Sequence, residues 1–167
     1  MLHYSTMPTP TGAFTTVIDD DGAVLAAGFT AQPADLVPLI HPNLVGELTP
    51  AAHLGDVTRA VRSYLEGDLT AIDDVPVRQQ IGGTFIGHAW RVMREIKPGA
   101  PVTYTAFAEM AGRPAAIRGA ASACARNAAA LFVPCHRVLR LDGSLGGYRW
   151  GLPVKRWLLH HEAGPGA

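Results

Sequence analysis

The first thirty residues alternate short apolar runs with polar turn residues, a pattern typical of β-strands joined by tight turns. Residues 2–6, 14–18 and 23–29 are extended or β-branched runs. The segment 8–12 predicts a turn between the first two, and Asp19-Asp20-Asp21-Gly22 predicts a hairpin before the third. We therefore expect a small β-sheet at the N-terminus.

Prolines interrupt the pattern from Pro33 to Pro50, and we expect this stretch to be irregular. Thr49-Pro50 predicts the N-cap and first position of a helix that runs to Gly67, because proline suits the first helical position. The run 68–78 predicts a further short strand.

The pattern changes near Gly82-Gly83, where we place the boundary between an N-terminal α/β domain, 1–82, and a C-terminal domain, 83–167. Beyond it, apolar residues recur at helical spacing. The first predicted helix carries four apolar residues on one face: Phe85, Ala89, Trp90 and Met93. Three helices are predicted here, at 84–96, 103–112 and 115–126.

The second and third of these helices form a candidate helix-turn-helix. Thr103 predicts the N-cap of the second helix, with Phe107 and Met110 facing inward, and Gly112-Arg113-Pro114 makes the turn. The third helix is built mostly of Ala and Gly, and Arg118 is its one long early side chain. Such a bare helix packs tightly on another helix or approaches a nucleic-acid groove closely.

Charge divides the chain although the formal net charge is zero. Residues 1–83 hold three bases and ten acids, a net charge of −7, whereas residues 84–167 hold eleven bases and four acids, a net charge of +7. Either the basic half faces a polyanion such as nucleic acid, or the two halves neutralise each other. No apolar run is long enough for a membrane span and no signal peptide is visible, so we expect a soluble cytoplasmic protein.

Two cysteines carry the candidate chemistry, Cys124 and Cys135. Their spacing fits neither a zinc site nor a disulfide framework, and the seven histidines lack partners at ligand spacing, so no metal is expected. Cys124, on the alanine-rich helix, is interpreted as a small buried hydrophobe. Cys135 stands between Pro134 and His136, and because an adjacent base lowers the effective pKa of a thiol, we predict that it is reactive.

The segment Pro134-Cys135-His136-Arg137-Val138 resembles the active-site signature of the O6-alkylguanine-DNA alkyltransferases. The resemblance covers residues 84–162, and the run 140–151 is most similar to the C-terminal domain of the bacterial adaptive-response proteins. Residues 1–83 match only in length, β-rich character and one helix end. The other matching features are Tyr104, Arg118, Asn127, Gly146-Gly147-Tyr148, the run Lys155–Leu159 and Glu162.

This resemblance implies an α+β fold, with a small RNase H-like N-terminal domain packed on a mainly helical C-terminal domain that contains a helix-turn-helix. It implies direct-reversal DNA repair without a cofactor. The protein would flip O6-alkylguanine, mainly O6-methylguanine, out of double-stranded DNA and transfer the alkyl group irreversibly to Cys135. A monomer that reacts once is expected.

The resemblance also implies a role for each matching residue. Cys135 would accept the alkyl group, and His136 would take its proton through a water while Glu162 holds the imidazole. Asn127 would fix the turn before the Cys segment, and Tyr104 would crowd the target phosphate. Alternatively, Tyr104 packs at a helix start and Glu162 lies at the surface.

DNA would dock through the third helix in the minor groove, with Arg118 replacing the extruded base in the stack. Arg118 could instead be a solvated or phosphate-contacting arginine. The remaining predicted DNA contacts are Ala115, Gly119, Ala123 and Arg126. The remaining predicted pocket residues are Tyr148, the backbone of Val138, Arg149 and Trp150.

Some residues depart from the family pattern. Ala128, Ala129 and Ala130 replace prolines that often follow the Asn, and Trp150 replaces a small residue. We therefore expect a narrower pocket that favours methyl over benzyl-sized adducts. The zinc-binding cysteines of a full adaptive-response protein are missing, so phosphotriester repair is not expected.

Three other functions remain open. An alkyltransferase-like protein would flag lesions without transfer, but those relatives lack the acceptor Cys. A thiol hydrolase using Cys135 and His136 would turn over small substrates repeatedly. A helix-turn-helix regulator would bind a defined operator and tolerate Cys135→Ser.

Overall fold

The computed structural model describes residues 1–79 and 84–164. The chain forms two compact units, Met1–Gln80 with Ala128–Phe132 and Ile81–Asn127 with Val133–Ala167. The predicted boundary near Gly82-Gly83 lies outside the described residues, so the division into domains 1–82 and 83–167 stays a prediction. The fold is a mixed α+β fold, as the sequence predicts.

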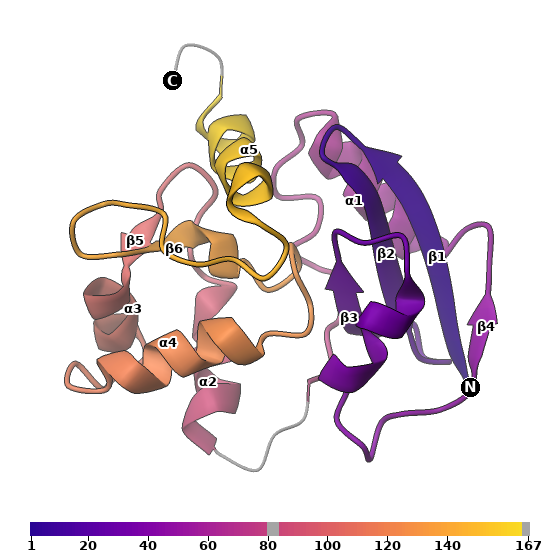
Figure 1. Ribbon diagram of the computed structural model, residues 1–167, viewed down its shortest axis with the longest axis horizontal. Coiled ribbons are helices and arrows are strands. Elements are labelled where there is room, and N and C mark those ends of the chain that lie inside the picture. Colours follow the sequence, from indigo (N-terminus) through magenta and orange to yellow (C-terminus); the bar gives the residue numbers. More distant parts are fainter. Residues whose placement is uncertain (80–83, 165–167) are drawn as a thin grey trace. The chain divides into compact units, whose positions relative to one another are not determined.

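The first unit is built on a four-stranded sheet in the order β3-β2-β1-β4 (Figure 1). Two antiparallel pairings join β1 to β2 and β2 to β3, and β4 pairs with β1 in parallel. The strands are β1 (Leu2–Thr9), β2 (Gly12–Ile18), β3 (Val24–Gly28) and β4 (Leu48–Pro50). The predicted turns between the first three strands are confirmed.

Two elements of this unit differ from the sequence prediction. Thr49-Pro50 does not open a helix, because Leu48–Pro50 pairs with β1 and the helix α1 spans Asp56–Leu65 after Gly55. Asp56 supplies the acidic first-turn residue that favours a helix start. The run 68–78 is a series of turns, with backbone bonds such as Ala71 N–H to Asp68 O, and only Val77 bridges to Val24.

The segment Ala128–Phe132 belongs to the first unit although it lies late in the sequence. Ala27 donates its N–H to Ala128 O (2.8 Å) and accepts from Ala130 N–H (3.1 Å), so the segment continues the sheet beside β3. The Phe132 ring lies 6.3 Å from that of Phe14, a fully buried residue. Burial of apolar surface therefore ties this segment to the sheet.

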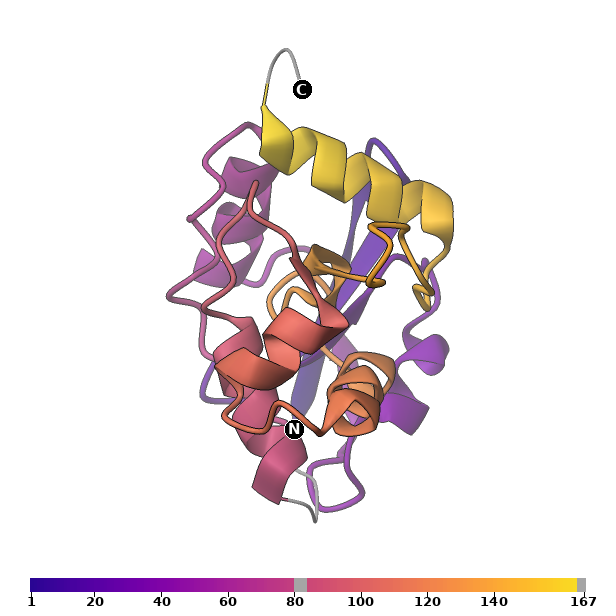
Figure 2. The same ribbon diagram turned by 90° about the vertical axis from the view of Figure 1, so that its left-hand side faces the viewer.

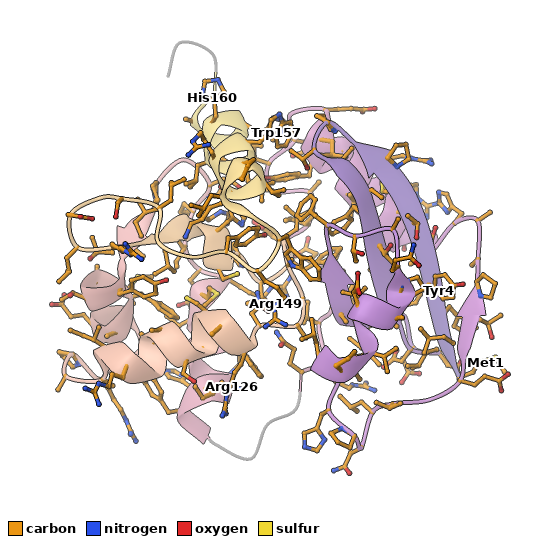
Figure 3. The ribbon with its side chains drawn as sticks, in the orientation of Figure 1. Met1, Tyr4, Arg126, Arg149, Trp157 and His160 are labelled. Carbon is orange, nitrogen blue, oxygen red and sulfur yellow. The ribbon has the colours of Figure 1, made fainter. Side chains whose placement is uncertain are left out.

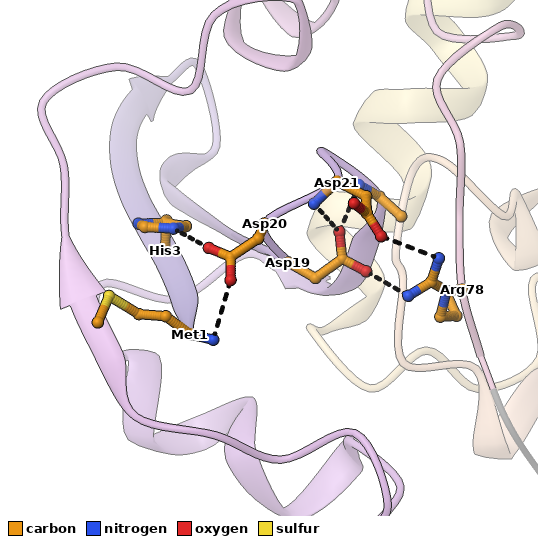
Figure 4. Close-up of polar contacts among 7 residues, drawn as sticks. Met1, His3, Asp19, Asp20, Asp21 and Arg78 are labelled. Carbon is orange, nitrogen blue, oxygen red and sulfur yellow. Dashed lines mark hydrogen bonds and ion pairs between the residues drawn. The ribbon is translucent and has the colours of Figure 1, made fainter.

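The acidic hairpin of this unit is partly neutralised by cations of the same unit (Figure 4). Arg78 pairs with Asp19 at 2.7 Å and with Asp21 at 3.7 Å. Asp20 accepts hydrogen bonds from the N-terminal amine (3.2 Å) and the His3 ring (2.9 Å). Local pairs thus account for part of the negative charge of residues 1–83 without any contribution from the basic half.

The second unit is mainly helical, and α3 and α4 lie side by side in both views (Figure 1 and Figure 2). A two-stranded parallel ladder joins β5 to β6. The elements are α2 (Thr84–Met93), β5 (Val102–Thr103), α3 (Tyr104–Met110), α4 (Ile117–Arg126), β6 (Val138–Leu139) and α5 (Leu152–Ala163). No helix within 1–79 or 84–164 combines the length and apolarity that crossing a bilayer requires.

Helix α3 begins as its sequence predicts. The Thr103 hydroxyl accepts a hydrogen bond from Ala106 N–H at 3.1 Å, which caps the helix. Phe107 faces inward and is fully buried. Met110, predicted to face inward, is 42% exposed because the helix ends at this residue and the chain turns away.

Helix α4 packs closely on α2, which explains its small residues. The Trp90 indole N–H donates to Ala123 O at 2.8 Å, and Ala120 and Ala123 are fully buried. A Cβ added at Gly119 would lie 2.8 Å from a Phe85 ring carbon, closer than carbon atoms pack. The predicted DNA contact of Ala123 is therefore corrected, because this residue is fully buried, whereas Gly119 is partly exposed and its DNA contact stays a prediction.

Candidate active site

Cys135 opens a 3₁₀ turn, Cys135–Arg137, that leads into β6. Asn127 ends α4 with an extended backbone, and its side-chain amide donates to Val133 O at 2.7 Å. The Cys135 N–H donates to the same carbonyl at 2.9 Å. One carbonyl, Val133 O, thus joins the end of α4 to the start of the Cys turn.

A buried network of three side chains follows the cysteine. His136 and Glu162 meet at 2.8 Å between Nε2 and Oε2, and neither side chain has accessible surface. Arg137 donates two hydrogen bonds to the same carboxylate, from Nε to Oε1 (2.8 Å) and from Nη2 to Oε2 (2.9 Å). Its Nη1 donates to Ile96 O at 2.7 Å. Glu162 is therefore buried and not at a frayed surface.

The second ring nitrogen of His136, Nδ1, is the atom that can accept a proton. Because Nε2 lies against a carboxylate, it carries the proton and donates it, which leaves the lone pair on Nδ1. Nδ1 is buried and has no hydrogen-bond partner among the described residues. An imidazole held in this tautomer can accept a proton at Nδ1.

Burial and pairing set the ionisation of these groups. Burial lowers the pKa of His136, so the ring is neutral at pH 7. Burial alone would raise the pKa of Glu162, but His136 and Arg137 outweigh it and hold that pKa far below its usual value. The site therefore combines a neutral base with a permanent carboxylate.

The pKa of the Cys135 thiol differs from the sequence expectation, which was that the adjacent base lowers it. Burial raises the pKa of Cys135 above its usual value, and the Asn127 side chain, Lys155 and Arg149 offset only part of that rise. The neighbouring imidazole is uncharged and does not lower it. Ionisation of Cys135 thus needs a proton acceptor at the moment of reaction, although the residue keeps some accessible surface.

Two tyrosines lie within electrostatic reach of the thiol. Burial, then Cys135 and Glu162, raise the pKa of Tyr148, and its hydroxyl is buried without a hydrogen-bond partner in the described part of the chain. Burial, then Cys124 and Cys135, also raise the pKa of Tyr104. Both hydroxyls are therefore protonated at neutral pH.

The other predicted pocket residues are placed as follows. Val138 is fully buried in β6, Trp150 is half-buried, and Arg149 is exposed. The Arg149 guanidinium donates to Ala125 O near the end of α4, and Figure 3 labels this side chain.

Three of the predicted DNA contacts lie at the surface of α4 or just before it: Ala115, Arg118 and Arg126, the last labelled in Figure 3. The side chains of Arg118 and Arg126 have no hydrogen bond or ion pair to any residue the structure describes. Arg113, in the turn before α4, lies over the Phe85 ring at 5.3 Å. These unpaired, exposed guanidiniums are available to an anionic partner.

Sequence reasoning missed two buried cations. Arg137 is 2% exposed and forms a salt bridge with Glu162. Lys155 is only 1% exposed, and its ammonium donates to Val138 O (2.9 Å) and Gly147 O (3.4 Å). Its spacing of three and seven residues from Leu158 and Glu162 on α5 was a visible sign of an inward face. No cluster of metal-ligating side chains occurs within the described residues.

Comparison with known proteins identifies relatives of this chain. Residues 84–164 match the model of the 6-O-methylguanine DNA methyltransferase DNA-binding domain. A methylated-DNA–protein-cysteine methyltransferase of Shigella flexneri is 34% identical over 158 residues, which are 92% of this chain and 91% of the relative. The bifunctional transcriptional activator/DNA repair enzyme Ada of Escherichia coli is 48% identical over 82 residues, 49% of this chain but only 23% of that protein.

Solved structures give the same result over nearly the whole chain. The O6-methylguanine methyltransferase of Mycobacterium tuberculosis has a TM-score of 0.79 at 27% identity, covering 100% of this chain and 97% of the other. A structure of Mycobacterium tuberculosis OGT in complex with DNA has a TM-score of 0.80 at 28% identity, covering 96% and 92%.

The fold and the thiol site together define the class of protein: the chain is an alkyltransferase. It belongs to the methylated-DNA–protein-cysteine methyltransferase family. The resemblance stated from the sequence is thereby confirmed.

Proposed function

We propose that this protein repairs alkylated DNA by accepting the alkyl group of O6-alkylguanine, mainly O6-methylguanine, on Cys135 Sγ. The observation that carries the proposal is the buried imidazole of His136, the residue that follows Cys135 in the chain, which is held by Glu162 and has no partner at Nδ1 among the described residues. The family membership and the DNA-bound relative support double-stranded DNA as the partner.

The proposed reaction is a displacement at the alkyl carbon. His136 Nδ1 accepts the Cys135 proton through a bridging water, the sulfur attacks the carbon, and the C–O6 bond breaks as the S–C bond forms. The electron pair leaves on guanine O6, and the Tyr148 hydroxyl donates a hydrogen bond to that oxygen. Overall, the thiol proton ends on guanine and the alkyl group ends on sulfur.

The O6 atom lies inside the duplex, so transfer requires that the nucleotide be flipped out, at a cost of a few kcal/mol. We propose that α3 and α4 act as a helix-turn-helix in the minor groove. Arg118 fills the vacated stack and Tyr104 crowds the target phosphate. The exposed, unpaired state of Arg118 supports this assignment.

One equivalent of protein is proposed to repair one lesion, because the thioether product is stable. The test mixes limiting protein with an excess of an O6-methylguanine duplex and follows restored guanine by chromatography. A burst equal to the protein concentration and no further product is expected. Continued turnover would overturn the single-use proposal and favour a hydrolase. The RNase H-like assignment, the monomeric state and the cytoplasmic location stay predictions.

Replacing Arg118 by Ala is expected to slow transfer from duplex DNA by about tenfold or more, because the flipped state loses the group that fills the stack. Reaction with free O6-benzylguanine base, which needs no flipping, should stay within about twofold. Single-turnover kinetics at saturating DNA measure both rates. Arg126→Ala is the matched control, and it should weaken binding and its salt dependence without lowering the saturated rate. An unchanged duplex rate in Arg118→Ala would contradict the stacking role.

Trp150→Gly is expected to raise the ratio of benzyl to methyl transfer rates by about tenfold or more, because a wider pocket admits the larger group. Competition between O6-benzylguanine and O6-methylguanine duplexes measures the ratio. If the ratio does not change, Trp150 does not narrow the pocket.

A further inference from the structure

Lys155 is a buried cation that the reaction just described does not use. It is 1% exposed and lies in the first turn of α5, where the helix dipole disfavours positive charge. Lysine is almost never fully buried unless it is paired. Two unfavourable conditions, burial and a position in the first helical turn, therefore meet at one side chain, which calls for a compensating interaction.

The hydrogen bonds of Lys155 solvate its charge without neutralising it. Its ammonium donates to two backbone carbonyls, Val138 O at 2.9 Å and Gly147 O at 3.4 Å. Within 1–79 and 84–164 it forms no ion pair with a carboxylate. A buried ammonium has three donors, so the third is available to another acceptor.

The charges buried around the cysteine do not balance unless the thiol ionises. Glu162 and Arg137 cancel as a close ion pair, and His136 is neutral. Among the buried side chains described in the second unit, Lys155 then leaves one unit of positive charge. A Cys135 thiolate would cancel it.

We infer that Lys155 is the buried counter-charge of the Cys135 thiolate, a positioning residue that acts on the reaction through the ionisation of the sulfur. The inference rests on the proposed function only in taking Cys135 as the nucleophile. Lys155 lowers the pKa of Cys135, and Cys135 in turn raises the pKa of Lys155 against the effect of burial. The other charged or titratable groups facing these two are Tyr104, Cys124, His136, Arg140, Tyr148 and Arg149.

A purely structural role is the competing explanation, since the same ammonium ties β6 to the loop at Gly147. The two explanations differ in pH dependence. Loss of these structural hydrogen bonds slows the reaction equally at every pH. Loss of the counter-charge raises the pKa of the thiol and slows the reaction only below that pKa.

The test measures carbamidomethylation of Cys135 by iodoacetamide, without DNA, from pH 5 to pH 10. Peptide mass mapping separates Cys135 from Cys124, whose pKa burial raises. In Lys155→Met, the rate at neutral pH should fall about tenfold and the profile should move to higher pH, since an opposite charge nearby lowers a thiol pKa by one unit or more. Lys155→Arg should keep the wild-type profile, and Arg156→Met, which removes an exposed cation from the same helix, should also keep it.

An unmoved profile in Lys155→Met, or a uniform slowing at all pH values, would overturn the inference. If that variant does not fold, the wild-type protein provides the second measurement, an NMR titration of the Lys155 side chain before and after S-methylation of Cys135. The pKa of Lys155 should fall after methylation, and an unchanged pKa would overturn the inference. The reaction with iodoacetamide needs no DNA. If Lys155→Met shifts the pH profile of that reaction but the wild-type protein transfers no methyl group from O6-methylguanine DNA, the proposed function is contradicted and the inference about Lys155 is not.

Discussion

Cys135→Ser is expected to lose alkyl transfer by at least about a thousandfold, the scale on which removing a covalent nucleophile reduces enzymatic rates. A serine hydroxyl ionises far less readily than a thiol, and the neutral His136 cannot make it a comparable nucleophile. The smaller oxygen fits the same turn, so the fold should survive. Restored guanine in an O6-methylguanine duplex measures the rate.

The second cysteine gives a matched control. Cys124 lies on α4, and burial raises its pKa so that it stays protonated. Cys124→Ser should therefore transfer methyl at the wild-type rate. Retained transfer by Cys135→Ser, or its loss in Cys124→Ser, would place the acceptor elsewhere.

Glu162→Gln is expected to lower the free energy of unfolding by about 3–5 kcal/mol, because it leaves Arg137 buried without its counter-charge. Urea unfolding at pH 7 measures the change. Glu109→Gln is the control, since this carboxylate is exposed on α3, and it should cost less than about 0.5 kcal/mol.

The difference between wild type and Glu162→Gln should also depend on pH. The folded state holds the pKa of Glu162 below its ordinary value of 4.5, so its contribution is complete at neutral pH. It is lost as pH falls below the unfolded value, because the unfolded state then binds the proton first. A constant difference between pH 7 and pH 3, or a loss below 1 kcal/mol at pH 7, would show that the Arg137–Glu162 pair contributes little.

Local signals predicted much of the fold. The hairpin at Asp19–Gly22 and the Thr103 cap depend on residues close together in sequence, and both were predicted. The start of α1 was not, because Leu48–Pro50 is fixed by pairing with β1, a contact between distant residues. The inclusion of Ala128–Phe132 in the first unit is likewise a long-range contact that no local pattern contains.

The distinction between local signals and long-range contacts also explains which residues of the site could be predicted. Cys135, His136 and Asn127 lie within nine residues, and a sequence motif singled them out. The pairing of Glu162 with Arg137 joins residues 25 apart, so sequence reasoning kept a surface alternative for Glu162. The face of α4 turned toward α2 was misassigned at Ala123 because a run of small residues does not reveal which side packs.

The most direct test of the central claim is the intact mass of the protein after reaction with an O6-methylguanine duplex. The account predicts a gain of one methylene per molecule, and peptide mapping should locate it on Cys135 with Cys124 unmodified. An unchanged mass while guanine is restored, or a methyl group on any other residue, would contradict it.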